Sequence, residues 1–176
     1  MKEDIRYAAK IKRKYFQGLR REYADECIFD NFLNAFGGLE SFFIYNSFGT
    51  EADTQKIISY LKAAKKRVYL PRVEGENIVP VPLGETKSGA YGIKEPTGQA
   101  FTGDIDVTII PLLAVNRRGY RIGYGGGYYD RYLKDAKTLK VGLCYDFQIA
   151  NFDEDGWDKR LDRLLTEKGI YHFGDT

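Results

Sequence analysis

Apolar residues recur along the chain at two spacings, one typical of helices and one typical of buried strands. Helical spacing runs through residues 2–36, and Gly37-Gly38 ends that region, as glycine commonly does after a helix. The same spacing returns at 54–65 with Ile57, Ile58 and Leu61. Short, nearly continuous apolar runs instead predict strands, at 41–47, 67–71, 78–81, 106–113 and 139–145.

The order of these elements predicts the fold class. Strands that alternate with helices favour an α/β fold of three layers, in which a mostly parallel sheet has helices on both faces. The last apolar stretch, Leu161–Leu165, precedes a polar tail. Neither a repeat nor a low-complexity linker divides the sequence, so residues 1–176 are expected to form a single domain.

Composition narrows the class of protein. With 27 Lys and Arg against 25 Asp and Glu, the net charge of +2 gives no general case for binding nucleic acid. No apolar run approaches the roughly 20 residues that a membrane-spanning helix needs. The two cysteines, Cys27 and Cys144, are too few for a disulfide framework. We therefore expect a cytoplasmic protein, monomeric or weakly dimeric, with small-molecule partners and no membrane or nucleic-acid partner.

The chain's most distinctive segment is Arg121-Ile-Gly-Tyr-Gly-Gly-Gly-Tyr-Tyr-Asp130, which we call the glycine loop. Glycines let backbone N–H groups approach an anion, and a helix that begins at Tyr128 would add its positive end. Arg121 at the start of this loop and Asp130 at its end suit a phosphate with a divalent cation. The loop matches neither the Walker A pattern nor Gly-x-Gly-x-x-Gly. The alternative interpretation is a flexible surface turn, which the charged and aromatic flanking residues make less favourable.

Ligands of parallel α/β folds bind at the carboxyl ends of the strands. Four segments follow predicted strands: the glycine loop, 46–51, Arg72 and 146–148. All four are therefore expected to meet at one edge of the sheet.

The first 21 residues carry eight basic side chains, at positions 2, 6, 10, 12, 13, 14, 20 and 21. Runs of this kind are usually solvated helix faces, and we predict that interpretation for 10–14, Arg20 and Arg21. Lys2 and Arg6 are four residues apart and share one helix face. The only histidine, His172, lies in the tail and is predicted to be on the surface, which disfavours a histidine-based triad or zinc site.

The glycine loop closely resembles the signature of the 5-formyltetrahydrofolate cyclo-ligase family, also called methenyltetrahydrofolate synthetase. With Arg131 included, it differs from Arg-Leu-Gly-Tyr-Gly-Gly-Gly-Tyr-Tyr-Asp-Arg only at Ile122. The resemblance continues in order over nearly the whole chain, through segments 45–54, 68–72, 92–96, 106–114, 142–148 and 158–167.

This resemblance implies the fold, the activity and the site. It implies a sheet like that of sugar-phosphate isomerases and CoA-transferases, and an ATP- and Mg²⁺-dependent conversion of 5-formyltetrahydrofolate to 5,10-methenyltetrahydrofolate through phosphorylation of the formyl oxygen. ADP and phosphate would be released. Arg121 and Tyr129 are the catalytic candidates, and Asp130 and Asp158 the metal ligands. The implied nucleotide-binding residues are Lys2, Arg6, Arg121, Ile122, Gly123, Tyr124, Gly125, Gly126, Gly127, Tyr128 and Tyr129. The implied folate-binding residues are Asn46, Glu51, Tyr91, Tyr124, Gly125, Gly126, Gly127 and Tyr128.

Two departures from the family pattern keep other functions open. Val115-Asn116 stands where relatives commonly have Phe-Asp, and Trp157 stands where a histidine precedes the second acid. The dense acids at 153–158 also leave the second metal ligand open by a residue or two. The alternatives are a non-catalytic nucleotide- or folate-binding protein, a sugar-phosphate isomerase, which would need no ATP, and a family paralogue with another substrate.

Overall fold

The computed structural model describes residues 1–174 of the chain. Its helices are α1 (Lys2–Tyr15), α2 (Leu19–Phe36), α3 (Gln55–Ala63) and α4 (Tyr128–Leu133), with two 3₁₀ turns, η1 (Ala90–Gly92) and η2 (Asp146–Gln148). Its strands are β1 (Ser41–Ile44), β2 (Arg67–Glu74), β3 (Asn77–Pro82), β4 (Thr86–Ser88), β5 (Lys94–Pro96), β6 (Val107–Ile110), β7 (Ala114–Val115), β8 (Arg121–Ile122), β9 (Leu139–Leu143), β10 (Arg163–Thr166) and β11 (Gly169–His172).

Seven strands form the main sheet, in the order β11-β10-β9-β6-β1-β2-β3. The five inner strands pair in parallel, whereas β11 and β3 pair antiparallel at the two edges. The predicted mostly parallel sheet is therefore confirmed. Two smaller ribbons, β4-β5 and β7-β8, lie outside it.

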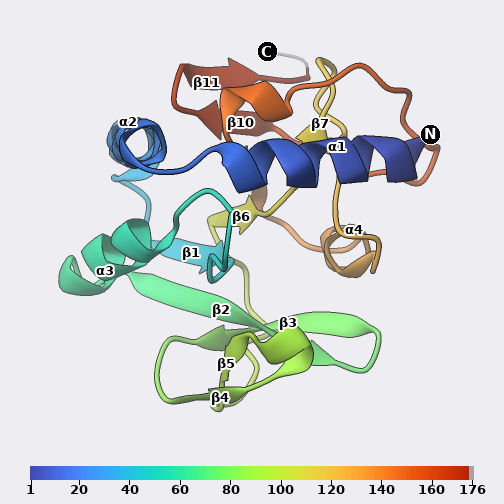
Figure 1. The fold of residues 1–176 in the computed structure, drawn as a ribbon. Coiled ribbons are helices and arrows are strands. Elements are labelled where there is room, and N and C mark those ends of the chain that lie inside the picture. Colours follow the sequence, from blue (N-terminus) through green and yellow to red (C-terminus); the bar gives the residue numbers. More distant parts are fainter. Residues whose placement is uncertain (175–176) are drawn as a thin grey trace.

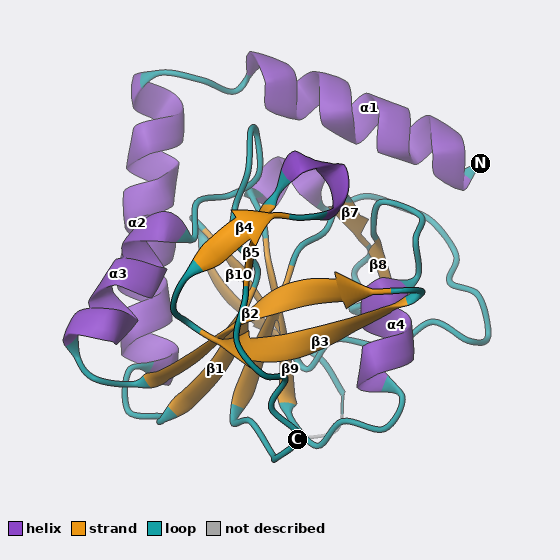
Figure 2. Cartoon of the chain, turned by 90° about the horizontal axis from the view of Figure 1, so that it is seen from below, coloured by secondary structure: helices purple, strands orange, loops and turns teal. Residues whose placement is uncertain are grey.

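Helices cover both faces of the sheet, as predicted (Figures 1 and 2). Alternate residues of β1 show the division, because Phe42 and Ile44 pack in a core cluster with α2 and α3, while Phe43 packs in another with tyrosines of α4. This alternation is what a strand buried on both faces requires. Helix α1 stands apart from these layers and lies across the carboxyl-end side of the sheet (Figure 2).

Several predicted boundaries were wrong. The helical region 2–36 is two helices, because Gly18 has a φ of 72°, which a continuous helix cannot contain. The predicted polar tail is largely β11, whose exposed His172 confirms the surface assignment of that residue. The strand predicted at 67–71 continues to Glu74 because its residues 69–74 pair with β3.

No helix among residues 1–174 is long and apolar enough to cross a bilayer. Both cysteines are free, Cys144 being buried and Cys27 partly exposed.

Candidate active site

One cavity of about 880 Å³ lies beneath α1, near the upper end of the volume range of small-molecule sites. All residues predicted for the site line it, although they come from segments far apart in the sequence: Lys2, Arg6, Asn46, Glu51, Tyr91, 121–130 and Asp158. The wall also includes residues that the sequence did not indicate, among them Lys10, Arg13, Lys14, Phe48, Asp155 and Trp157. The structure thus brings the predicted set together; their chemical roles remain predictions.

The glycine loop leaves β8 and turns into α4 along the cavity wall. Gly125 and Gly127 have φ values of 104° and 70°, which side-chain-bearing residues seldom adopt. Arginines hold two loop carbonyls: Arg6 Nε donates to Gly123 at 2.8 Å, and Arg131 Nη2 to Gly126 at 2.8 Å. Within the described part of the chain, the N–H groups of residues 123–127 have no protein acceptor. A loop with fixed carbonyls and unused N–H donors is suited to an anion. Because α4 has only six residues, the expected helix-end contribution is small and the loop itself dominates.

Arg121 is a buried cation at the base of this loop. Its Nη2 lies 3.5 Å from Asp130 Oδ1, and its guanidinium lies 5.7 Å from the centre of the Tyr129 ring. Its Nε has no hydrogen-bond partner, alone among buried side-chain polar atoms of residues 1–174. Burial lowers the pKa of Arg121, although the charges of Asp130, Tyr129 and Asp158 oppose this. An arginine that is buried with an unused N–H donor can bind an anionic ligand.

The amino-terminal end of α1 is tied to the acidic segment after η2. Lys2 Nζ lies 2.5 Å from Asp155 Oδ2 and 3.2 Å from Asp158 Oδ2, which itself accepts from the Asp155 N–H. Burial acts to lower the pKa of Lys2, but these two carboxylates outweigh it and raise the pKa. Asp158 therefore reaches the cavity, where Asp155 and the exposed Trp157 lie beside it.

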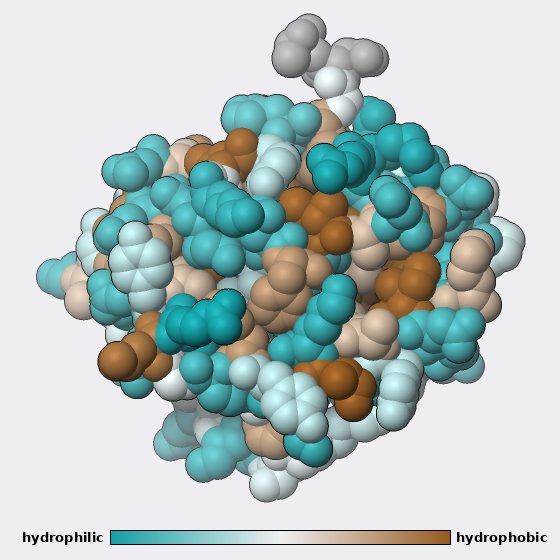
Figure 3. Space-filling view, turned by 45° about the horizontal axis from the view of Figure 1, so that its top comes forward, coloured by the Kyte–Doolittle hydropathy of each residue, from teal (hydrophilic) through white to brown (hydrophobic). Residues whose placement is uncertain are grey.

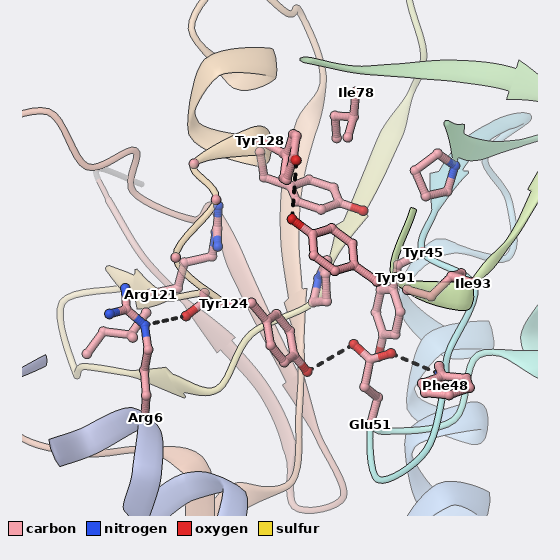
Figure 4. A pocket seen from close by; sticks show the side chains of 18 of the residues that line it. Arg6, Tyr45, Phe48, Glu51, Ile78, Tyr91, Ile93, Arg121, Tyr124 and Tyr128 are labelled. Carbon is pink, nitrogen blue, oxygen red and sulfur yellow. Dashed lines mark hydrogen bonds between the residues drawn. The ribbon is translucent and has the colours of Figure 1, made fainter. Parts of the chain in front are cut away.

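Arg13 is the main residue that the sequence interpretation missed. It was predicted to be on the surface, yet only 6% of it is exposed. Its Nη1 donates to Tyr124 Oη at 2.7 Å and its Nε to Thr50 Oγ1 at 3.1 Å. Tyr124 in turn donates to Glu51 Oε2 at 3.1 Å, and Glu51 accepts from the Phe48 N–H at 2.9 Å (Figure 4). One signal was present: Arg13 falls four residues after Ala9 and three before Phe16, on the inward face of the helix.

Aromatic side chains close the other side of the cavity. The hydroxyls of Tyr91 in η1 and Tyr128 in α4 lie 3.4 Å apart (Figure 4). Tyr91 is 77% exposed and has a φ of 59°, an uncommon conformation for a tyrosine. Tyr129, behind them, packs against Phe43. Its phenol is desolvated, and this burial raises its pKa, so it can donate a hydrogen bond but will not ionise near neutral pH.

Two of the four predicted strand-end segments do not reach the cavity. Arg72 lies within β2 and binds the Pro96 and Gly98 carbonyls and Glu74, so its role is to hold the β4-β5 ribbon. Segment 146–148 is used internally, since Asp146 accepts from Thr166 and Tyr171. The convergence was overestimated because strand order alone does not show which way each loop turns.

Asn116, which departs from the family pattern, has a structural role. It is buried in the β7-β8 turn, where its Oδ1 accepts from the Arg118 and Tyr120 N–H groups. Its Nδ2 donates to the Phe152 carbonyl and Glu154. This residue holds the turn and does not line the cavity.

Replacing Glu51 by glutamine should remove a pH-dependent loss of stability. Burial raises the pKa of Glu51, although bonds from Phe48 and Tyr124 and the charge of Arg13 oppose this. The folded chain therefore holds this proton more tightly than the unfolded chain, and stability falls as the pH rises from the unfolded pKa through the folded one. We expect the Glu51→Gln variant to gain stability relative to the wild type as the pH rises from 4 to 7, measured by urea unfolding. The matched Glu85→Gln variant, at an exposed glutamate outside the cavity, should differ in stability from the wild type by the same amount at every pH. An equal pH-dependent gain in both variants would contradict the assignment.

Comparisons with known proteins identify the same family. The family model described as "5-formyltetrahydrofolate cyclo-ligase family" matches residues 2–167. The chain is 55% identical to the 5-formyltetrahydrofolate cyclo-ligase of Mycoplasma genitalium over 64 residues, which are 35% of this chain and 39% of that protein. It is 33% identical to that of Escherichia coli (strain K12) over 144 residues, covering 74% and 79% of the two chains.

A solved structure agrees over a longer span. The Aquifex aeolicus 5,10-methenyltetrahydrofolate synthetase superposes with a TM-score of 0.89 at 31% identity, covering 99% of this chain and 94% of that one. Since the match extends over nearly all of the sheet and the cavity wall, this chain belongs to the 5-formyltetrahydrofolate cyclo-ligase family.

Proposed function

We propose that this protein converts 5-formyltetrahydrofolate to 5,10-methenyltetrahydrofolate at the expense of ATP. The observation that carries the proposal is one cavity in which the glycine loop, with unused N–H donors and the buried Arg121, lies opposite Glu51, to which Tyr124 of the loop donates. The glycine loop suits the phosphates of a nucleotide, and the region around Glu51 suits a polar heterocycle. Membership of the family supports the same pairing of substrates.

Phosphoryl transfer needs positioning and charge stabilisation more than covalent chemistry from the protein. Lys2, Arg6 and the loop N–H groups would hold the phosphates, and Arg121 would stabilise the charge that develops on the transferred group. The formyl oxygen would attack the γ-phosphorus and release ADP. N10 would then attack the activated carbon, and loss of phosphate would leave the methenyl product.

Two side chains would orient the folate. Glu51, held by Tyr124 and the Phe48 N–H, presents a carboxylate to the cavity beside Asn46. Tyr129 keeps its proton near neutral pH and would donate to the formyl group, while Tyr91 and Tyr128 cover the substrate and exclude water.

The carboxylates fit a magnesium ion that binds together with phosphates. No group of three or more metal-ligating side chains exists in residues 1–174. Mg²⁺ commonly uses one or two carboxylates plus phosphate oxygens, and Asp130 and Asp158 both act on Arg121 from the cavity wall. They would hold the ion, which would neutralise phosphate charge when bound.

The proposal is tested by incubating the purified protein with 5-formyltetrahydrofolate and Mg·ATP and following the absorbance of the methenyl product. We expect product to form only when ATP is present and to stop when EDTA removes the metal. ATP hydrolysis without methenyl product would indicate a paralogue with another substrate. Binding of ATP or folate without turnover would indicate a non-catalytic protein. Either result would overturn the proposal.

A further inference from the structure

Four basic side chains form one row along α1. Lys2, Arg6, Lys10 and Lys14 are spaced four residues apart, which places them on one face of the helix, and all four line the cavity. At 1.5 Å per residue, the row extends about 18 Å from Lys2 to Lys14. The neighbouring Lys12 is exposed and does not line the cavity. The row therefore presents charge along the cavity over a distance greater than a triphosphate group needs.

The two halves of the row differ in their partners. Lys2 pairs with Asp155 and Asp158, and Arg6 with Glu3 and the Gly123 carbonyl. For Lys10 and Lys14, the described chain offers no carboxylate within ion-pair distance. Lys2 and Arg6 thus lie at the glycine-loop end, whereas Lys10 and Lys14 carry charges that no described carboxylate neutralises.

The second half of the row lies at the opposite end of the cavity. Arg13, between Lys10 and Lys14 in the helix, bonds to Thr50 in the loop that follows β1. Figure 1 shows this loop rising toward the carboxyl-terminal half of α1, while α4 lies beneath the amino-terminal half. The lysines therefore stand beside Phe48 and Glu51, the end proposed for folate. On the face drawn in Figure 3, apolar residues are scattered among hydrophilic ones.

We infer that Lys10 and Lys14 bind the carboxylates of the glutamyl tail of the reduced folate. The inference rests on the proposed function and adds a subsite to it. Folate is elongated, with the reacting pterin at one end and a glutamate with two carboxylates at the other. With the heterocycle held at Glu51 and its formyl group facing the glycine loop, the tail extends along α1 to two cations that have no ion-pair partner among residues 1–174.

The test varies the tail and the lysines together. We would compare 5-formyltetrahydrofolate with its tail-free pteroate analogue, in the wild type and in the double variant Lys10→Gln/Lys14→Gln. Since exposed ion pairs are individually weak, we expect the double variant to raise KM for the glutamate form by about 3- to 10-fold. KM for the pteroate form and KM for ATP should stay unchanged. The Lys12→Gln variant removes one charge from the same helix outside the row and should leave every constant unchanged.

Three results would overturn the inference: equal loss for both forms, loss of ATP affinity with folate unaffected, or the same effect in Lys12→Gln. If no form turned over, the proposed function would fail, and equilibrium binding of the two folates to the same variants would still test the subsite. In that measurement, a preference for the glutamate form that survives Lys10→Gln/Lys14→Gln would overturn it.

Discussion

Replacing Arg121 by methionine should lower kcat/KM by about 10²- to 10³-fold, the size of effect seen when one charge-stabilising donor is removed from an active site. The same variant should be more stable than the wild type. Arg121 is buried, its Nε lacks a partner, and its contact with Asp130 is 3.5 Å long. An apolar side chain of similar length avoids that desolvation cost, so we expect a gain of about 1 kcal/mol in the free energy of unfolding.

A fall in activity together with a rise in stability distinguishes a functional arginine from a structural one. Steady-state assays and urea unfolding would be run on Arg121→Met and on Arg121→Lys, which keeps the charge but loses the planar fork. The lysine variant should recover only part of the activity. Arg118→Met, at an exposed arginine of the β7-β8 turn, serves as the control for arginine removal, with kcat/KM close to the wild type. Loss of stability together with activity in Arg121→Met would show that the residue mainly holds the fold.

Arg13→Met should have the reverse effect on stability. This arginine is equally buried, but its hydrogen bonds to Tyr124 and Thr50 are made in the free protein. Its removal leaves polar partners unsatisfied, and we expect a loss of about 2 kcal/mol in the free energy of unfolding. Because Tyr124 and Glu51 lose their support, KM for the folate should rise by about 10-fold, which corresponds to about 1.4 kcal/mol. KM for ATP should not change.

A double-mutant cycle distinguishes this support from a general effect on α1. Tyr124→Phe keeps the ring and removes the hydroxyl that joins Arg13 to Glu51. If the three residues act as one unit, Arg13→Met and Tyr124→Phe together should raise the folate KM little more than either alone. Strict additivity would mean that Arg13 acts on folate binding by another route, and an equal rise in the ATP KM would mean that it only anchors the helix.

The sequence was informative where the pattern itself has a physical cause. Runs such as 106–113 are apolar because inner parallel strands are buried on both faces, and β6 is fully buried as expected. The glycine loop was found because the turns at Gly125 and Gly127 need residues without a Cβ. The residues predicted around it came mainly from the family resemblance, and they line one cavity.

What the sequence could not show depends on tertiary contacts. Arg13 is chemically the same as its exposed neighbours, and only the position of Thr50 and Tyr124 makes it a buried residue. Likewise, the break at Gly18 was hidden by helical spacing on both sides, and the pairing of β2 with β3 extended a strand that the apolar run alone ended at Pro71. Arg72 and segment 146–148 do not line the cavity because they bind groups elsewhere in the fold: Arg72 donates to the Pro96 carbonyl, and Asp146 accepts from the Tyr171 hydroxyl.

The ion pair between Lys2 and Asp155 has a consequence for synthesis, because it joins residues 153 positions apart. During translation, α1 emerges before its partner, and at about 5–20 residues per second roughly 8 to 30 s separate them. Closing so long a loop carries an entropic cost, and α1 has few contacts of its own with the sheet. The sheet should therefore assemble first, with α1 docking afterward. Nascent chains halted before residue 155 should bind ligand poorly even though most of the fold has been made.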